Sequence, residues 1–333
     1  MIFMAKKRIA INGMGRIGRL LLKILLNHDT VEVVAINDLS PDDDLQYLIK
    51  YDTAQRNQPQ DVRVEGEFLV VNGHKIQSFA IADPLQLPWK DLNIDIVVEC
   101  TGIFRKREKL EMHLTAGAKK VVLSAPAKGD IKTVVIGINE DIITPEDTIL
   151  SNASCTTNCL APMVKVLDEL CGIDHAIMNT VHAYTGDQNL QDAIHKSDMR
   201  RARAAAENIV PTTSNATSTL EIIIPKMKGR LTGGAVRVPV MVGSLTELYA
   251  NVSRLVTKEE INQAFLTASK GKLNNILAYN TDPIVSSDII GNAHSCIFDA
   301  DLTIVMGNLV KITGWYDNEF GYASRLAELV EMV

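Results

Sequence analysis

Apolar residues in the first half of the chain form short, nearly continuous runs, which predict strands buried on both faces of a parallel sheet. These runs occupy residues 8–11, 31–36, 94–99, 121–123 and 133–137. Apolar residues recur at helical spacing from Ile17 to Leu25, which predicts a helix after the first strand. Between Tyr51 and Pro88 the pattern changes to short alternating pieces, and Asn72-Gly73 predicts a β-hairpin turn there. We therefore expect an α/β domain with an inserted hairpin.

The second half alternates between helical and strand-like patterns. After Cys155, apolar residues fall on one helical stripe as far as Cys171, and Gly172 lies where a helix is expected to stop. Pro162 is expected to kink this helix or to delay its regular start. Further strands are expected at 176–181, 244–256 and 310–312, with helices at 258–269 and near the end of the chain. The alternation from 244 to 256 predicts antiparallel sheet.

A glycine motif separates the first strand from the first helix. Gly13, Gly15 and Gly18 form Gly-x-Gly-x-x-Gly in the strand–turn–helix context that binds a dinucleotide pyrophosphate. Asp38 follows the next strand, where its carboxylate would accept hydrogen bonds from the adenosine ribose; the alternative is a turn residue before Pro41. Three more candidates lie at the carboxyl ends of strands, where open α/β sheets bind ligands: Thr101, Gly102 and Ser124.

Cys155 lies near the start of a predicted helix. Unpaired N–H groups and the helix dipole favour a thiolate at such a position. Ser154, Thr156 and other hydroxyl and amide side chains surround it in the sequence, a polarity that an inert core cysteine does not need. Cys159, one helical turn further on, leaves open a redox role for the same thiol.

His182 is the candidate general base, because an imidazole can accept a thiol or hydroxyl proton at neutral pH, and as a cation it would stabilise a Cys155 thiolate. The sequence alone does not establish contact between the two residues. The other histidines, among them His113, are expected to be solvated. Arg200 lies in an arginine-rich segment that is either a phosphate clamp or a solvated or intersubunit face. Arg237 lies within a strand-like run, where an anionic ligand would explain its charge.

Length and composition set broad limits. A chain of 333 residues with 46% apolar and 22% charged residues is expected to form two globular domains. Its apolar runs are too short for a membrane span, and Met1 to Arg8 lack the pattern of a signal peptide, so we expect a cytoplasmic protein. The net charge of −6 argues against general nucleic-acid binding, and the 5 cysteines lack metal-site spacing, so no metal is expected.

The stretch Ser151-Asn152-Ala153-Ser154-Cys155-Thr156-Thr157-Asn158-Cys159 resembles the active-site motif of phosphorylating glyceraldehyde-3-phosphate dehydrogenase. The similarity extends from Arg8 to about Val330. It includes the glycine motif and the segments 181–185, 200–206, 237–239 and 315–319.

This resemblance implies a doubly wound Rossmann-type NAD-binding domain over 1–153, completed by a C-terminal helix at 319–333. It implies a catalytic domain over 154–318 with a mostly antiparallel sheet, and a homotetramer. The implied glycolytic and gluconeogenic reaction converts D-glyceraldehyde 3-phosphate, NAD and inorganic phosphate to 1,3-bisphosphoglycerate and NADH through a Cys155 thioester.

The resemblance also assigns roles to residues. Cys155 would be the nucleophile and His182 the base. Residues implied for the substrate phosphate are Thr185, Asp187 and Arg237, and those for inorganic phosphate are Ser154, Thr156, Arg200 and Ser214. Residues implied for the cofactor are Arg16, Ile17, Asp38, Ser124 and Asn318, with Tyr316 close by.

Some positions differ from the family pattern. Ser214-Asn215-Ala216-Thr217-Ser218 stands where the family commonly has Thr-Gly-Ala-Ala-Lys, so we expect weaker use of inorganic phosphate. Ala193-Ile194 replaces a Leu-Pro typical of NAD-specific members, while Asp38 still favours NAD over NADP.

Two alternatives stay open. The nearest is an erythrose-4-phosphate dehydrogenase, in which water cleaves the thioester; this chain keeps Tyr184-Thr185 and 125–128, where those relatives tend to differ. The other is a non-catalytic binding protein, which the intact Cys155 and His182 argue against.

Overall fold

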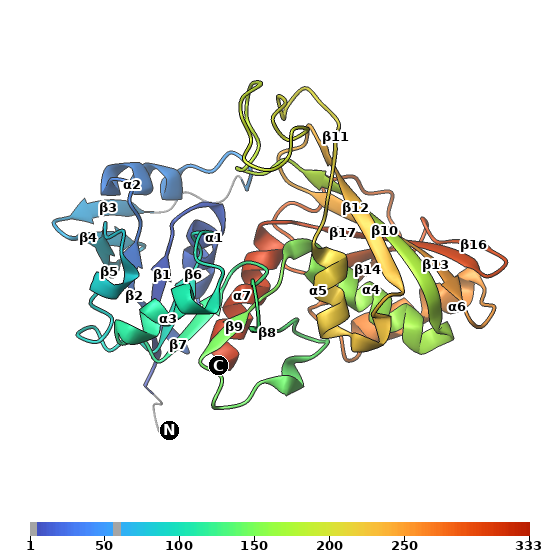
Figure 1. Ribbon diagram of the computed structural model, residues 1–333, viewed down its shortest axis with the longest axis horizontal. Coiled ribbons are helices and arrows are strands. Elements are labelled where there is room, and N and C mark those ends of the chain that lie inside the picture. The colour runs from blue at the N-terminus through green and yellow to red at the C-terminus, as the bar shows by residue number, and fades with distance from the viewer. Residues whose placement is uncertain (1–4, 56–60) are drawn as a thin grey trace. The chain divides into compact units, whose positions relative to one another are not determined.

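The computed structural model describes residues 5–55 and 61–333 and divides the chain into two compact units. The first unit comprises residues up to 134, 141–153 and 323–333; the second comprises 135–140 and 154–322 (Figure 1). Residues 1–4, part of the stretch that argued against a signal peptide, lie outside the described residues.

The first unit is built on one sheet with strand order β3-β4-β5-β2-β1-β6-β7-β9-β8. Its strands are β1 (Lys7–Asn12), β2 (Val31–Asn37), β3 (Val62–Glu65), β4 (Phe68–Val71), β5 (His74–Phe79), β6 (Ile96–Glu99), β7 (Lys120–Leu123), β8 (Lys132–Thr133) and β9 (Ile149–Ser151). Its helices are α1 (Arg16–Leu25), α2 (Asp42–Lys50), α3 (Arg107–Thr115) and the short η1 (Pro84–Gln86).

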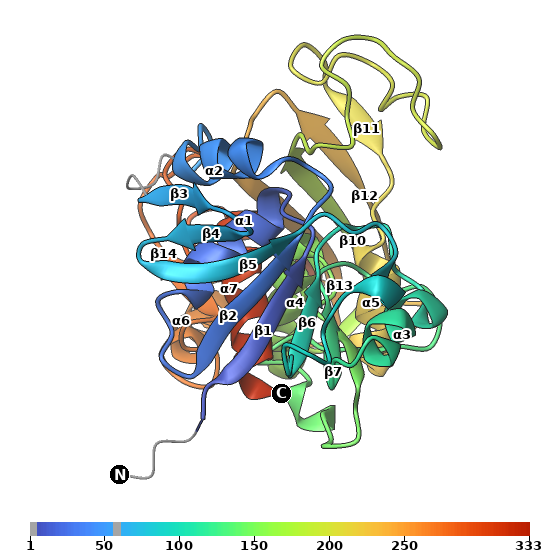
Figure 2. The same cartoon turned by 90° about the vertical axis from the view of Figure 1, so that its left-hand side faces the viewer.

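In the sheet order β5-β2-β1-β6-β7-β9-β8, every neighbouring pair of strands is parallel. Strand β1 lies between β2 and β6, where the strand order reverses (Figure 2). Successive residues Ile9, Ala10 and Ile11 of β1 are all fully buried, so both faces of the sheet are covered, as the apolar runs predict. The reversal at β1 is the place where open α/β sheets bind ligands.

The C-terminal helix α7 (Phe320–Met332) returns to the first unit from residue 323 onward. Glu331 ties it to the N-terminal part of the chain: its carbonyl oxygen accepts from Lys7 Nζ at 2.6 Å, and its carboxylate lies 2.8 Å from His28 Nδ1.

The hairpin prediction is confirmed, whereas one predicted strand is wrong. β4 and β5 pair antiparallel around Asn72 and Gly73, whose φ angles of 49° and 85° suit a type I′ turn. The run 133–137 leaves the sheet after Thr133, because Asn139 Oδ1 accepts from the backbone N–H of Val135 and the chain turns at Gly137. Val134 and Val135 are nevertheless fully buried, which explains their strand-like pattern.

The second unit contains a sheet in the order β11-β12-β10-β13-β17-β15-β14, with β16 paired to β17. Its strands are β10 (Ile173–Ala183), β11 (Val210–Thr212), β12 (Leu231–Val238), β13 (Ser244–Val252), β14 (Leu277–Asn280), β15 (Cys296–Asp299), β16 (Ile304–Met306) and β17 (Leu309–Tyr316). Its helices are α4 (Cys155–Cys171), α5 (Ala216–Ile223), α6 (Lys258–Lys270) and the short η3 (Pro225–Met227), while η2 (Glu140–Ile142) falls where the chain passes between units. Most pairs are antiparallel, with β10–β12 and β14–β15 parallel.

Helix α4 is packed closely against this sheet. Gly314 of β17 makes the approach possible, because a Cβ there would lie 2.8 Å from Met163 Sδ and 3.3 Å from Cys159 Sγ, both in α4. α4 begins at Cys155 and continues through Pro162, so the proline does not delay its start. It ends, as predicted, before Gly172, whose φ is 70°.

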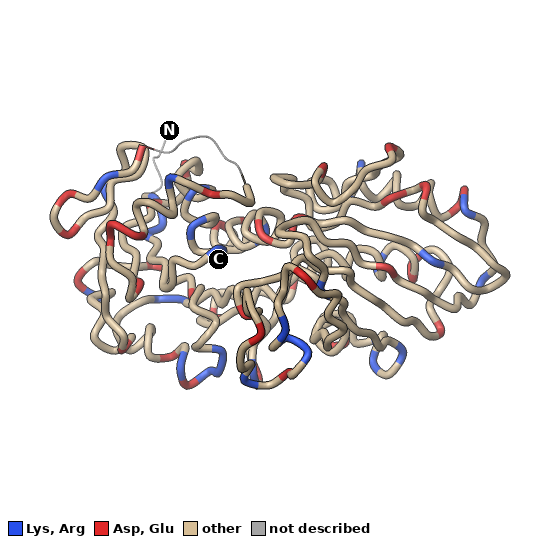
Figure 3. Tube along the Cα trace, turned by 90° about the horizontal axis from the view of Figure 1, so that it is seen from above, with Lys and Arg blue, Asp and Glu red and all other residues tan. Residues whose placement is uncertain are grey.

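Lys and Arg are interspersed with Asp and Glu along both units (Figure 3). In the described part of the chain, no helix combines the length and apolar character that a membrane crossing requires.

Candidate active site

The N-terminus of α4 holds Cys155 against His182. Ser154 caps the helix by accepting a hydrogen bond from the backbone N–H of Thr157 at 3.1 Å, which fixes Cys155 as the first helical residue. His182 lies near the end of β10, and its Nε2 is 3.5 Å from Cys155 Sγ. The structure thus brings together the two candidates whose contact the sequence left open.

Arg237 lies on the other side of the His182 ring. Its Cα pairs with that of His182 in the parallel β10–β12 ladder, so both side chains leave the sheet at the same level. Arg237 Nη1 is 2.8 Å from His182 Nδ1, 2.9 Å from the Ala183 carbonyl oxygen and 3.2 Å from Thr185 Oγ1.

Tyr316 packs beneath the pair. Its ring meets that of His182 edge-on, with centroids 5.8 Å apart. Its hydroxyl bonds to Thr156 Oγ1 at 3.0 Å and Thr180 Oγ1 at 2.8 Å, which joins α4, β10 and β17. Burial raises the pKa of Tyr316, so this hydroxyl stays protonated and keeps its hydrogen bonds to both threonines.

Burial dominates the protonation of the pair. It raises the pKa of the Cys155 thiol, although Arg237 and the Thr156 hydroxyl act in the opposite direction. Burial, and then the Arg237 charge, lower the pKa of His182 to about 3. Burial and Arg237 therefore disfavour a cationic His182, although the hydrogen bond to the Ala183 carbonyl and the Asp187 charge favour it.

The predicted anion-binding residues divide into two groups. Thr185 donates its hydroxyl to Asp187, which also binds Arg201 Nη1 at 2.7 Å, so Thr185, Asp187 and Arg237 form one connected cluster. Burial opposes ionisation of Asp187, but these partners lower its pKa overall. Arg200 is exposed and Ser214 caps the turn into α5 through the backbone N–H of Ala216; among the described residues neither bonds to Cys155 or His182.

In the first unit the glycine loop is shaped for an elongated anion. Gly13 has φ +97°, and a Cβ there would lie 2.6 Å from the backbone N of Thr101. A Cβ on Gly18 would lie 2.0 Å from the Gly13 carbonyl oxygen, whereas one on Gly15 would meet nothing within 4 Å. Gly15 is also the N-cap of α1, so open space lies before a helix N-terminus, which fits a dinucleotide pyrophosphate.

The other predicted cofactor residues surround this loop. Asp38 accepts from the backbone N–H of Met14 at 2.7 Å and of Ser40 at 2.9 Å; burial opposes its ionisation, but these bonds lower its pKa overall. Arg16 pairs with Asp52 at 2.9 Å, Ile17 is half-buried in the first turn of α1, and Gly102 has φ +71° with open space beyond it.

A buried network that the sequence reasoning missed holds the loop in place. Glu99, at the end of β6, accepts from Asn12 Nδ2 at 2.6 Å and from the backbone N–H and hydroxyl of Thr101. Trp89 Nε1 donates to His113 Nδ1 at 3.1 Å, so the proton of His113 is on Nε2, 3.2 Å from Glu99. His113 is fully buried, and its predicted solvation is wrong. The sequence did contain a signal for this network: Glu99 ends a buried strand, and a buried carboxylate requires hydrogen-bond partners.

Asn318 and Ser124 complete the predicted set. Asn318, in the second unit, is buried, and its Oδ1 accepts from Ser244 Oγ at 3.0 Å and from the backbone N–H of Gly243 at 3.2 Å. The backbone N–H of Ser124 donates to the Glu99 carbonyl oxygen at 3.0 Å. Among the described residues, no cluster of His, Cys, Asp and Glu is placed to hold a metal ion.

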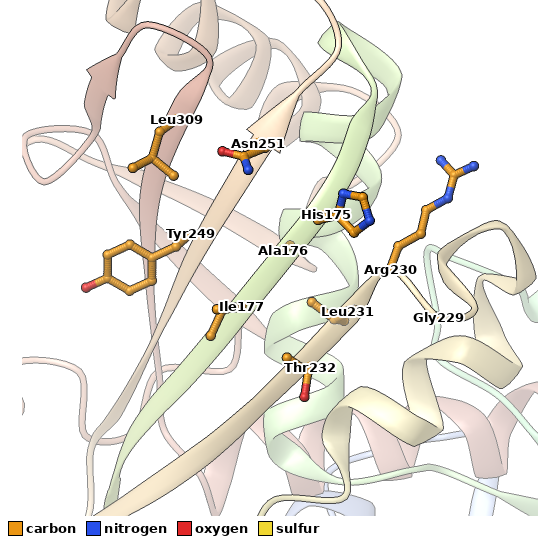
Figure 4. A pocket seen from close by; sticks show the side chains of 10 residues that line it. All are labelled: His175, Ala176, Ile177, Gly229, Arg230, Leu231, Thr232, Tyr249, Asn251 and Leu309. Atoms are coloured by element: carbon orange, nitrogen blue, oxygen red, sulfur yellow. The ribbon is translucent and has the colours of Figure 1, made fainter.

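A separate hollow of about 310 Å³ lies on the sheet of the second unit. Its walls come from the early part of β10 and from β12, β13 and β17, and they include Ile177, Tyr249 and Leu309 (Figure 4). Neither Cys155 nor His182 lines it.

Comparisons with known proteins agree with this geometry. Residues 7–107 match the family model described as the glyceraldehyde 3-phosphate dehydrogenase NAD binding domain, and residues 154–318 match that of the C-terminal domain. Similar curated proteins include glyceraldehyde-3-phosphate dehydrogenase 2 of Streptomyces avermitilis (50% identical over 329 residues) and the glyceraldehyde-3-phosphate dehydrogenase of Kitasatospora aureofaciens (50% over 328). That of Mycobacterium avium is 49% identical over 333 residues; all three alignments cover 98% of each chain.

The chain is therefore an NAD-dependent dehydrogenase with a nucleotide-binding and a catalytic region. It belongs to the glyceraldehyde 3-phosphate dehydrogenase family. This confirms the resemblance, the predicted α/β fold class and NAD as the cofactor.

Two glycine substitutions should separate cofactor binding from folding. Gly15→Ala should weaken NAD binding at least about 10-fold, because the methyl group enters the open space before α1, with little change in stability. Gly18→Ala should instead destabilise the fold by about 1–3 kcal/mol, because its Cβ overlaps the Gly13 carbonyl. Calorimetric titration with NAD measures the affinity, and urea unfolding measures the stability, of both variants. An unchanged NAD affinity in Gly15→Ala would contradict the assignment of the pyrophosphate to this loop.

His182 should make the protein sensitive to acid. Its folded-state pKa of about 3 is below the unfolded value of 6.5, so the unfolded chain binds more protons between these values and stability falls as the pH falls. His182→Asn should reduce the loss of unfolding free energy between about pH 7 and about pH 5 by about 2 kcal/mol. Urea unfolding at the two pH values measures this; equal losses in both proteins would refute a neutral, buried His182.

Proposed function

We propose that the chain oxidises D-glyceraldehyde 3-phosphate with NAD and inorganic phosphate to 1,3-bisphosphoglycerate and NADH. The observation that carries this proposal is the 3.5 Å approach of His182 Nε2 to Cys155 Sγ at the N-terminus of α4, in a member of this dehydrogenase family. A buried thiol beside a nitrogen base is the arrangement required for thioester chemistry.

Each step uses groups in this arrangement. Cys155 attacks the aldehyde carbon while its proton passes through His182 to the aldehyde oxygen, which forms a hemithioacetal. His182 then takes the hydroxyl proton as the carbonyl re-forms, and the backbone N–H of Cys155 stabilises the oxyanion. NAD, when bound, supplies the hydride acceptor. Inorganic phosphate then attacks the Cys155 thioester, which yields the acyl phosphate and releases the thiol.

We infer that the substrate's own phosphate is held by Thr185, Asp187 and Arg237. Arg237 supports this role because its Nε is buried and has no hydrogen-bond partner, although a guanidinium is well suited to phosphate. We place inorganic phosphate at Ser154, Thr156, Arg200 and Ser214; Thr156 Oγ1 lies 4.0 Å from Cys155 Sγ.

We assign the cofactor to two groups of residues. In the first unit they are Gly13, Gly15, Arg16, Ile17, Gly18, Asp38, Thr101, Gly102 and Ser124; in the second they are Tyr316 and Asn318. We also propose that 1–153 with 319–333 is the NAD-binding domain and that 154–318 is the catalytic domain.

We further propose a cytoplasmic homotetramer. Exposed apolar side chains support a subunit contact on the sheet of the second unit, where Ile177 of β10 and Tyr249 of β13 are neighbours in the ladder (Figure 4). Met306 of β16 is also exposed, and such a patch is typical of an interface.

Replacing the proposed nucleophile tests the reaction. Cys155→Ala should lower NADH formation by at least about 10⁴-fold, because no thioester can form, while NAD affinity stays nearly unchanged. Cys171→Ala, at the other end of α4, is the matched control and should retain turnover. Near-normal turnover in Cys155→Ala would refute the nucleophile assignment.

The phosphate prediction concerns Asn215. Its φ of −86° is open to any residue, and its carbonyl already accepts from Thr219 Oγ1, so glycine should preserve the fold and remove only the side chain. Asn215→Gly should lower the half-saturating concentration of inorganic phosphate, with no change in that of the aldehyde. Steady-state kinetics at varied phosphate measure this; an unchanged phosphate requirement would count against a role for Asn215.

A further inference from the structure

A buried carboxylate holds the start of the glycine loop from two sides. Glu99, the last residue of β6, is fully buried. Its Oε2 accepts from Asn12 Nδ2 at 2.6 Å, and Asn12 comes directly before Gly13. Its Oε1 accepts from the hydroxyl of Thr101 and, at 2.8 Å, from the backbone N–H of Thr101, against which Gly13 packs. Both groups that flank Gly13 are therefore bonded to one side chain.

The contact with Asn12 continues to the end of β2. Asn12 Oδ1 accepts from Asn37 Nδ2 at 2.7 Å, and Asn37 Oδ1 accepts from the backbone N–H of Ile81 at 2.9 Å. Asn37 comes directly before Asp38, and its carbonyl oxygen accepts from the backbone N–H of Gly13 at 2.8 Å. This chain of hydrogen bonds thus crosses the carboxyl ends of β6, β1 and β2, which are neighbours in the sheet (Figure 2).

The direction of each bond in this chain is fixed from its far end. A backbone N–H only donates, so Asn37 presents its amide oxygen to Ile81 and its NH₂ group to Asn12. The Ile81 carbonyl oxygen, 3.0 Å from Asn37 Nδ2, requires the same orientation. Asn12 then accepts with its amide oxygen, and its NH₂ group faces position 99. The side chain at position 99 must therefore accept this bond.

Two more fixed donors meet the same carboxylate. An indole N–H only donates, so the Trp89 bond to His113 Nδ1 leaves the His113 proton on Nε2, which lies 3.2 Å from Glu99 Oε2. The backbone N–H of Thr101 is directed at Oε1. Only a carboxylate accepts on both oxygens. An amide at position 99 would turn its own NH₂ group toward either Thr101 or Asn12, where a donor already points.

We propose that Glu99 is a positioning residue of the NAD site. Its carboxylate holds Gly13 and Thr101 and, through the two asparagines, Asp38 in the arrangement that the cofactor meets. Glu99 is buried and acts only through these residues. A site that is already ordered loses less conformational freedom when its ligand binds, so the carboxylate increases the affinity for NAD. This proposal rests on the proposed function in assigning NAD to these residues.

Calorimetric titration of the full chain with NAD tests the proposal without requiring turnover. Glu99→Gln keeps the size of the side chain but cannot accept on both sides. It should raise the dissociation constant of NAD at least about 10-fold, because one of the groups that flank Gly13 is released. In steady-state kinetics the KM for NAD should rise similarly. Turnover at saturating NAD should stay within about 3-fold, because Glu99 lies in the first unit and Cys155 and His182 lie in the second.

Trp89→Phe is the matched control, because it disturbs the same network at its other end. It removes the donor to His113 and leaves the contacts of Glu99 with Asn12 and Thr101 in place. Trp89 is fully buried, so the urea midpoint should fall, as it should in Glu99→Gln. The dissociation constant of NAD should nevertheless stay within about 2-fold of the original value. The comparison separates positioning of the cofactor site from stability.

A second variant tests the connection to Asp38 if Glu99→Gln does not fold. Asn12→Ala removes the link to Asn37 and leaves the bonds between Glu99 and Thr101 in place. It should raise the dissociation constant of NAD at least about 5-fold.

Three results would overturn the proposal: an unchanged NAD affinity in Glu99→Gln, an equal loss of affinity in Glu99→Gln and Trp89→Phe, or an unchanged affinity in Asn12→Ala. The Gly15→Ala titration tests the assignment of NAD to the glycine loop separately. A loss of affinity in Gly15→Ala but not in Glu99→Gln refutes the positioning role alone. Full affinity in Gly15→Ala refutes the assignment of NAD to the loop.

Discussion

The contact between Cys155 and His182 depends on how tightly α4 is packed against the sheet of the second unit. The helix begins at a fixed residue because Ser154 caps it, and it approaches β17 closely because Gly314 has no side chain. The Tyr316 hydroxyl then ties the helix start to β10. A sulfur atom and a ring nitrogen from distant parts of the chain are thereby held within 4 Å of each other.

The same packing creates an electrostatic problem. Removing water from the pair disfavours both the thiolate and the imidazolium, and the neighbouring Arg237 further disfavours the imidazolium. Arg237 and the hydrogen bonds from Thr156 act in the opposite direction on the thiol and favour its ionised form. Arg237 connects His182 to the anion-binding cluster, because its Nη1 lies 2.8 Å from His182 Nδ1 and 3.2 Å from Thr185 Oγ1.

The sequence predicted the parts that depend on local pattern. Apolar runs gave the parallel strands, Asn72-Gly73 gave the hairpin, and Gly172 gave the end of α4, because each depends on neighbouring residues alone. The run 133–137 was mistaken for a strand because burial without pairing produces the same pattern. Within the candidate site, the residue types alone indicated a nucleophile at Cys155, a general base at His182 and an anion-binding group at Arg237. Their contacts, and the Glu99–His113 network, join residues far apart in the chain and could not be read from it.

The central claim is that Cys155 forms a thioester that inorganic phosphate cleaves. Rapid mixing of the chain with NAD and glyceraldehyde 3-phosphate, with and without inorganic phosphate, tests it most directly. The account predicts a burst of NADH equal to the number of sites in both cases, followed by steady turnover only when phosphate is present. Fast turnover without phosphate would contradict it and indicate hydrolysis of the thioester by water; no burst in either case would contradict the thioester itself.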